Sequence, residues 1–157
     1  MNRAAWLALA ACIVSAALEG LFAGRGVKQY MTSLRMPRFA PSMPVWYVIG
    51  ALYYIACFVV LYRLLDQPPT QPNRTTALAL MLVLMSINAF WNYIFFRARN
   101  LFAVMLTNFV YTIIALALMA SLLSTDRIAA LIFAPYLVYL IFANFWGYQL
   151  WRLNAGR

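Results

Sequence analysis

Five long apolar runs, separated by clusters of charged residues and proline, dominate this sequence. They cover residues 4–23, 45–65, 75–96, 101–123 and 128–151. Because a helix rises about 1.5 Å per residue, each run is long enough to cross the roughly 30 Å hydrocarbon core of a bilayer. The runs are continuously apolar and do not alternate, which argues against a membrane β-barrel. The sequence therefore predicts an all-α integral membrane protein, a bundle of five transmembrane helices forming a single domain over residues 1–157.

Composition excludes several other classes of protein. Hydrophobic residues make up 66% of the chain and charged residues 10%, whereas soluble domains carry about 25% charged residues. The net charge of +9 comes from basic residues between the runs, where they anchor helices against lipid headgroups. No basic stripe suited to nucleic acid is present, so no nucleic-acid partner is expected. The chain has no histidine, so we expect neither a metal site nor a required cofactor.

The distribution of Lys and Arg predicts the orientation in the membrane. Four basic residues lie on the side of the N-terminus, and eight lie on the opposite side. The four are Arg3, Arg63, Arg74 and Arg127, and the eight are Arg25, Lys28, Arg35, Arg38, Arg97, Arg99, Arg152 and Arg157. By the positive-inside rule, the loop at residues 25–44 and the C-terminus are cytoplasmic. The first run is too long for a typical signal peptide, and we interpret it as a retained span.

The connection at residues 25–44 differs from the others. It is long, carries four basic residues, and contains Pro37, Pro41 and Pro44. Long loops in compact proteins are usually functional or disordered. The aromatic and methionine residues of this segment favour a folded lid.

Acidic residues are too few for obvious catalysis. Asp66 and Asp126 lie beside arginine in short connections and are expected to be solvated turn residues. Glu19 lies inside the first run, and an intramembrane carboxylate is a candidate functional site. The simpler alternative is that Glu19 reaches the interface and pairs with Arg25 or Lys28. The cysteines, Cys12 and Cys57, are expected to be small buried hydrophobes.

Aromatic residues recur at helical spacing in three of the runs, forming three aromatic stripes. A single stripe of this kind more often serves helix packing than ligand binding. Together, with polar tips and a lid, they suit the walls of a site for a large flat apolar ligand. The stripes are Trp46, Gly50, Tyr53 and Tyr54; Asn88, Trp91 and Phe95; and Tyr136, Tyr139, Ala143 and Trp146. Other polar residues of the spans are expected to join helices by hydrogen bonds. These are Asn92, Thr107, Asn108, Thr112 and Asn144.

Several ordered segments resemble the TspO/MBR family, which comprises the tryptophan-rich sensory proteins and the mitochondrial translocator protein, or peripheral-type benzodiazepine receptor. The similar segments are Pro37-Arg-Phe-Ala-Pro41, Asn88-Ala-Phe-Trp91-Asn-Tyr-Ile-Phe-Phe96, Arg99-Asn-Leu-Phe102, Pro135-Tyr-Leu-Val-Tyr139 and Leu153-Asn154. The resemblance implies a five-helix bundle, commonly a homodimer, with a pocket under the first loop. It also implies porphyrin or tetrapyrrole ligands, or in eukaryotes cholesterol and drug-like molecules.

Carried over by position, the resemblance implies ten ligand-binding residues. They are Phe39, Trp46, Gly50, Tyr54, Asn88, Trp91, Phe95, Thr107, Tyr139 and Ala143. We add Arg35 and Arg38 as candidate contacts for ligand carboxylates, because arginine pairs well with them.

The chain also departs from the family pattern. Gly50 and Tyr139 stand where the family usually has tryptophan, Phe39 replaces the loop tryptophan, and Ser42 replaces the second proline of a pair. Porphyrin degradation, ascribed to some members, depends on pocket tryptophans, so we do not expect an enzyme.

Three functions follow as hypotheses. We expect a binding or sensory protein for a porphyrin or another tetrapyrrole. A transporter of tetrapyrroles or other apolar ligands is the alternative, although the internal repeats and broken helices of many transporters are missing. Sterol-type binding rests only on a weak pattern between Val27 and Arg35.

Overall fold

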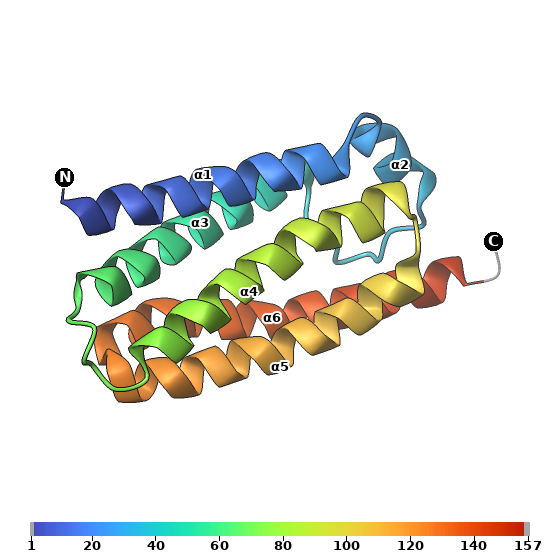
Figure 1. Ribbon diagram of the computed structural model, residues 1–157. Coiled ribbons are helices and arrows are strands. Elements are labelled where there is room, and N and C mark those ends of the chain that lie inside the picture. The colour runs from blue at the N-terminus through green and yellow to red at the C-terminus, as the bar shows by residue number, and fades with distance from the viewer. Residues whose placement is uncertain (1, 156–157) are drawn as a thin grey trace.

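A computed structural model describes residues 2–155, which form helices and connecting loops (Figure 1). Five of its helices are long and apolar enough to cross a membrane, which confirms the predicted fold class. The elements are α1 (Arg3–Ala23), α2 (Val27–Ser33), α3 (Met43–Asp66), α4 (Arg74–Asn92), the π-helix η1 (Tyr93–Arg97), α5 (Leu101–Thr125) and α6 (Arg127–Asn154).

Local signals in the sequence set the ends of these helices. The side chains of Asn2 and Asn100 accept hydrogen bonds from the amides of Ala5 and Ala103, respectively, and so cap α1 and α5. Pro44 lies in the first turn of α3, where its missing N–H has no cost. The residues that begin these helices therefore lie where the apolar runs of the sequence begin.

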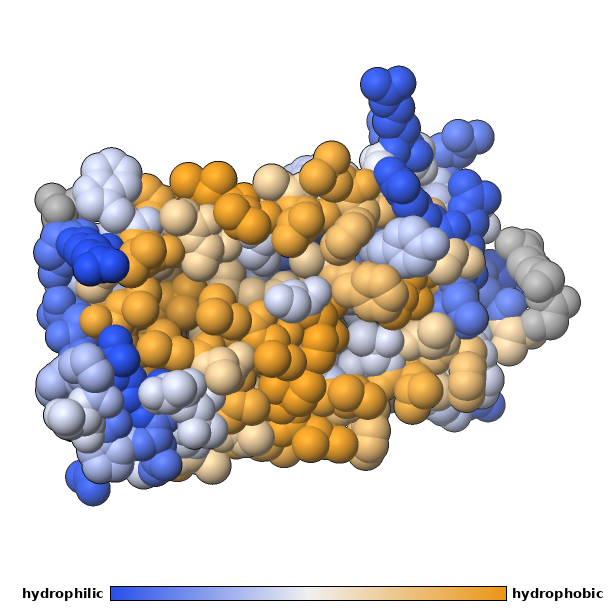
Figure 2. Space-filling view, viewed as in Figure 1, coloured by the Kyte–Doolittle hydropathy of each residue, from blue (hydrophilic) through white to orange (hydrophobic). Residues whose placement is uncertain are grey.

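The surface matches the lipid environment that the sequence predicts. Figure 2 shows a continuous apolar band between two hydrophilic ends. Large side chains in this band are exposed, including Leu131 and Ile141, each 72% exposed. Lipid is a favourable solvent for such side chains, whereas water is not, so the chain is an integral membrane protein.

The two ends of the bundle carry different features. One end holds the beginning of α1, the α3–α4 connection and the α5–α6 hairpin, while α2 and the end of α6 lie at the other (Figure 1). We call the second the lid end, after the segment 25–44 that it carries. Arg157, which we counted at this end, lies outside the described residues. Which end faces the cytoplasm stays a prediction.

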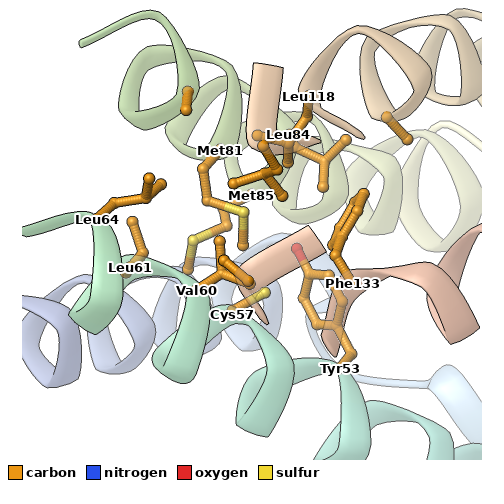
Figure 3. Close-up of a cluster of buried hydrophobic side chains, with 14 of the residues drawn as sticks. Tyr53, Cys57, Val60, Leu61, Leu64, Met81, Leu84, Met85, Leu118 and Phe133 are labelled. Atoms are coloured by element: carbon orange, nitrogen blue, oxygen red, sulfur yellow. The ribbon is translucent and has the colours of Figure 1, made fainter. Parts of the chain in front are cut away.

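The bundle is tightly packed toward the end opposite the lid. Val60, Leu64, Met81, Leu84 and Leu118 from α3, α4 and α5 are fully buried in one cluster (Figure 3). Cys12 and Cys57 are buried in the same cluster, as expected. This cluster closes that end of the bundle.

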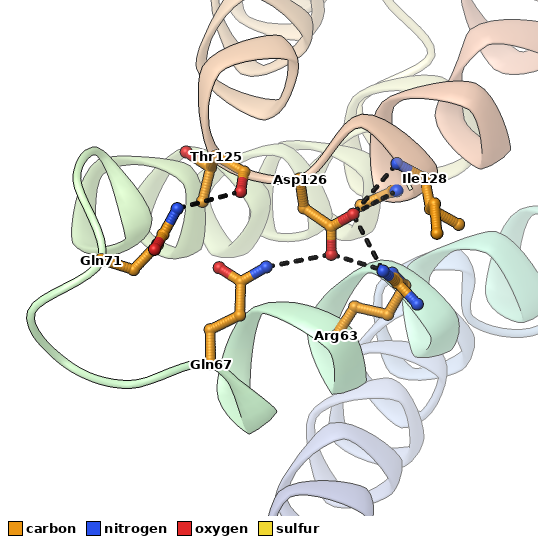
Figure 4. Close-up of polar contacts among 7 residues, drawn as sticks. Arg63, Gln67, Gln71, Thr125, Asp126 and Ile128 are labelled. Carbon is orange, nitrogen blue, oxygen red and sulfur yellow. Dashed lines mark hydrogen bonds and ion pairs between the residues drawn. The ribbon is translucent and has the colours of Figure 1, made fainter.

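Asp126 joins three helices at the same end, and our expectation that it is a solvated turn residue is wrong. It is only 8% exposed. Its carboxylate accepts hydrogen bonds from Arg63 at 2.8 and 3.0 Å, from Gln67 at 3.0 Å, and from the amides of Ile128 and Ala129 (Figure 4). Burial alone would raise the pKa of Asp126, but the Arg63 guanidinium and the two amides outweigh it, so the pKa lies below its ordinary value.

Replacing Asp126 is expected to destabilise the bundle. Asp126→Ala removes the cap of α6 and leaves Arg63 unpaired, and we expect the free energy of unfolding to fall by about 2 kcal/mol at pH 7. Because the folded-state pKa is lowered, the stabilisation is complete above the ordinary pKa of about 3.9 and is lost as the pH falls through the folded-state value. The difference between variant and wild type should therefore shrink when thermal unfolding in detergent is repeated at decreasing pH.

Asp66→Ala is the matched control, because Asp66 is an exposed acid at the same end of the bundle. We expect a change below about 0.5 kcal/mol for it. Equal losses for the two variants would contradict the role given to Asp126.

Candidate ligand cavity

A cavity of about 550 Å³ occupies the lid end of the bundle. Its size lies within the range of roughly 300–1,000 Å³ that is typical of small-molecule sites. All five membrane-spanning helices contribute to its wall, and Val27 and Met31 of α2 line it from the lid. The wall is largely aromatic. Its rings belong to Trp46, Tyr47, Tyr53, Tyr54, Trp91, Phe95, Phe96, Tyr111, Tyr136, Tyr139 and Trp146.

The structure brings the three aromatic stripes together around this cavity, since every residue of the three lines it. Neighbouring rings contact one another within and between helices. Trp91 and Phe95 are stacked with centroids 4.9 Å apart, and Trp46 meets Trp146 edge-on at 5.2 Å. The π-helix η1 begins between Trp91 and Phe95, so the α4 stripe continues through it without losing ring contact. π-helical turns are frequent at functional sites.

Eight of the ten residues predicted to bind a ligand belong to the wall. They are Trp46, Gly50, Tyr54, Asn88, Trp91, Phe95, Tyr139 and Ala143. Whether they contact a ligand stays a prediction. Gly50 has open space where a Cβ would stand, so this position leaves volume in the cavity.

The other predicted contacts lie outside the wall. Phe39 is 42% exposed and stacks on Phe145 at 5.1 Å, on the outside of α6. Thr107 bonds the carbonyl of Ala103 in its own helix. Arg35 and Arg38 are exposed on the lid, so their contact with ligand carboxylates stays a prediction.

Glu19 forms part of the cavity wall, and the expectation that it pairs with Arg25 or Lys28 is wrong. Its Oε1 accepts hydrogen bonds from the Tyr54 hydroxyl and from Asn88 Nδ2, both at 2.5 Å. One donor comes from α3 and the other from α4, so the carboxyl group of α1 joins three helices inside the cavity.

Two indole N–H groups on the wall have no protein partner. Trp91 Nε1 and Trp146 Nε1 are buried without a hydrogen-bond acceptor among the described residues. A buried donor without an acceptor costs about 1–3 kcal/mol. These two donors are therefore available to acceptor atoms of a bound molecule.

Polar residues of α5 complete the wall, and sequence reasoning missed their place in it. We predicted that Asn108 joins helices, and it does bond the carbonyl of Ala143 at 3.4 Å, but it also lines the cavity with Tyr111. The spacing of Asn108 and Tyr111, three residues apart, was the available signal. Asn144 bonds Thr112 across the same pair of helices, whereas Asn92 bonds only its own helix.

The lid is held over the cavity by specific contacts. The side-chain amide of Asn154 accepts a hydrogen bond from the Arg35 amide at 3.0 Å and donates one to the Arg35 carbonyl at 3.1 Å. Tyr30 is buried between Phe95 and the guanidinium of Arg99. The end of α6 and the α4–α5 connection thus fasten the lid.

A five-helix membrane bundle, closed by a packed core at one end and hollow with aromatic walls beneath a lid at the other, is the class that this fold and site define. The model of the TspO/MBR family matches residues 8–152, and the chain belongs to that family. Among curated proteins it is similar to Protein CrtK of Rhodobacter capsulatus, with 25% identity over 146 residues, covering 93% of this chain and 89% of that protein. The predicted resemblance is confirmed.

Loss of the Asn154 amide is expected to loosen the lid. Asn154→Ala leaves the Arg35 N–H without its acceptor, a loss of about 1 kcal/mol, so hydrogen exchange at this amide should accelerate roughly fivefold. Exchange measured by mass spectrometry over the lid peptides tests this expectation. Arg152→Ala, an exposed residue on the same last turn, should leave the rate unchanged. A rate in Asn154→Ala equal to that of wild type would exclude the proposed fastening.

Proposed function

We propose that this protein binds a flat, largely apolar molecule of the tetrapyrrole class in the cavity beneath the lid and acts as a binding or sensory protein. The observation that carries the proposal is the convergence of three aromatic stripes on one cavity of about 550 Å³. Aromatic faces stack on a planar ring system, while a few polar groups fix its orientation. The family membership supports the same class of ligand.

The chemistry of the wall favours stacking over coordination. The chain has no histidine, and no group of three or more Cys, Asp or Glu gathers in the described part of the chain. A tetrapyrrole would therefore be held by ring contacts, with the indole N–H groups of Trp91 and Trp146 reaching its acceptor atoms. The protein supplies shape and hydrogen bonds, and no resident cofactor is needed.

The closed end of the bundle favours binding over transport. The buried cluster around Leu64, Met81 and Leu118 fills the space between the helices beyond the cavity. A ligand passing across the membrane within the bundle would have to displace this packed core. We therefore expect saturable binding of protoporphyrin IX in detergent and no protein-dependent flux of it into liposomes. Protein-dependent flux would instead support the alternative hypothesis that the protein is a transporter.

Removing one ring from the wall is expected to weaken binding. Trp91→Ala deletes a ring stacked on Phe95, and aromatic contacts contribute about 0.5–1.5 kcal/mol beyond their buried area. A loss of that free energy raises Kd roughly two- to tenfold. We expect a rise of this size in the Kd for protoporphyrin IX, measured by quenching of tryptophan fluorescence.

Trp6→Ala is the matched control, because Trp6 is 59% exposed on the outside of α1, far from the cavity. Its Kd should stay at the wild-type value. Equal affinity in Trp91→Ala and wild type would mean that the α4 stripe serves helix packing alone. Absence of saturable quenching in the wild type by both protoporphyrin IX and its neutral dimethyl ester would overturn the proposed function.

A further inference from the structure

The cavity wall has an acidic side chain but no basic one among the described residues. Among the described residues that line the cavity, Glu19 is the single acidic residue, and there is no Lys or Arg. The basic residues of the lid end, including Arg35 and Arg38, lie outside the wall. A ligand carboxylate inside the cavity would therefore meet a carboxyl group and no cation.

The hydrogen bonds of Glu19 hold its carboxyl group in place through one oxygen and leave the other oxygen without a donor among the described residues. Both donors, from Tyr54 and Asn88, converge on Oε1. Oε2 receives no hydrogen bond from any described residue, and the side chain lines the cavity. Since lone carboxyl groups in membrane spans are costly to bury, one held by two donors with an unused oxygen at a cavity indicates a site for a further donor.

The surroundings of that oxygen suit a positively charged donor. Tyr54 donates its hydroxyl hydrogen bond to Glu19. Trp91 lies three residues after Asn88, on the same face of α4. Aromatic faces attract cations, and a carboxylate forms charge-assisted hydrogen bonds with N⁺–H groups. The carboxyl group and the aromatic rings thus line the same cavity.

We infer that Glu19 makes this cavity selective for planar aromatic ligands that present a protonated nitrogen, and unfavourable for ligands that present a carboxylate there. This inference rests on the proposed function, since it concerns the chemical class of ligand that the same cavity takes. The N⁺–H group donates to Oε2 of Glu19, while the ring system stacks on the aromatic wall.

Three derivatives of one porphyrin test this selectivity. Protoporphyrin IX carries two carboxylates, its dimethyl ester is neutral, and its bis-amide with ethylenediamine carries two protonated amines at pH 7. The Kd of each is measured by tryptophan quenching in the same detergent for wild type and Glu19→Gln, so that partitioning into micelles cancels in the comparison. Glutamine keeps the size of the side chain and an oxygen for Tyr54 and Asn88.

We expect Glu19→Gln to weaken binding of the diamine roughly ten- to a hundredfold, the value of one charge-assisted hydrogen bond. The dicarboxylate should bind the variant more tightly than the wild type, and the dimethyl ester should bind both within about twofold, which shows that the cavity is intact. Unchanged affinity of the diamine would overturn the inference while leaving the proposed function standing.

Asp66→Asn controls for charge at a distance, because it makes the same change in net charge at the opposite end of the bundle. All three affinities should stay at wild-type values in this variant. A loss of diamine binding equal to that of Glu19→Gln would overturn the inference. No saturable binding of any derivative to the wild type would overturn the proposed function and this inference together.

Discussion

The structure depends on hydrogen bonds between helices, because lipid is as apolar as the interior of the bundle and gives the helices little reason to associate. Two groups of such bonds lie at opposite ends. Asp126 ties Arg63 of α3 to the beginning of α6, and Glu19 ties α1 to α3 and α4 through Tyr54 and Asn88. The first fastens a packed end, whereas the second stands in the wall of a cavity. The same kind of interaction therefore joins helices around a packed core at one end and places a carboxyl group in a cavity wall at the other.

The contrast between the two ends follows from side-chain shape. Leu, Val, Met and Ala fill the interior at the closed end, where flexible or small side chains leave no gap. At the lid end, large rigid rings stand around positions such as Gly50 and Ala143, which have little or no side chain. Rings that contact each other edge-on or stacked cannot collapse into that space without losing those contacts. The cavity therefore forms because rigid rings stand beside small residues and cannot fill the space that those residues leave.

Sequence reasoning recovered the fold because membrane spans are set by length and apolarity, which are local properties. It also predicted which faces of α3, α4 and α6 line the cavity, because aromatic residues at helical spacing lie on the same side of a helix. It failed for Asp126 and Glu19, whose partners are 63 and 69 residues away in the sequence at the farthest. Such pairings arise only when helices assemble, and no periodicity encodes them. Phe39 lies outside the cavity wall for a related reason, because loop residues follow the path of the lid rather than a helical repeat.

The departures from the family pattern form a consistent set when they are placed in the cavity. At two positions where the resemblance implies tryptophan, Gly50 adds volume to the cavity and Tyr139 brings a hydroxyl group to its wall. Both changes reduce the apolar surface that a ligand would meet, and Glu19 adds a carboxyl group to the same wall. A cavity altered in this direction loses stacking area and gains hydrogen-bond acceptors. Its affinity would then depend more on the donors that a ligand carries, which is why the charge of the ligand, and not its ring alone, is the property to vary.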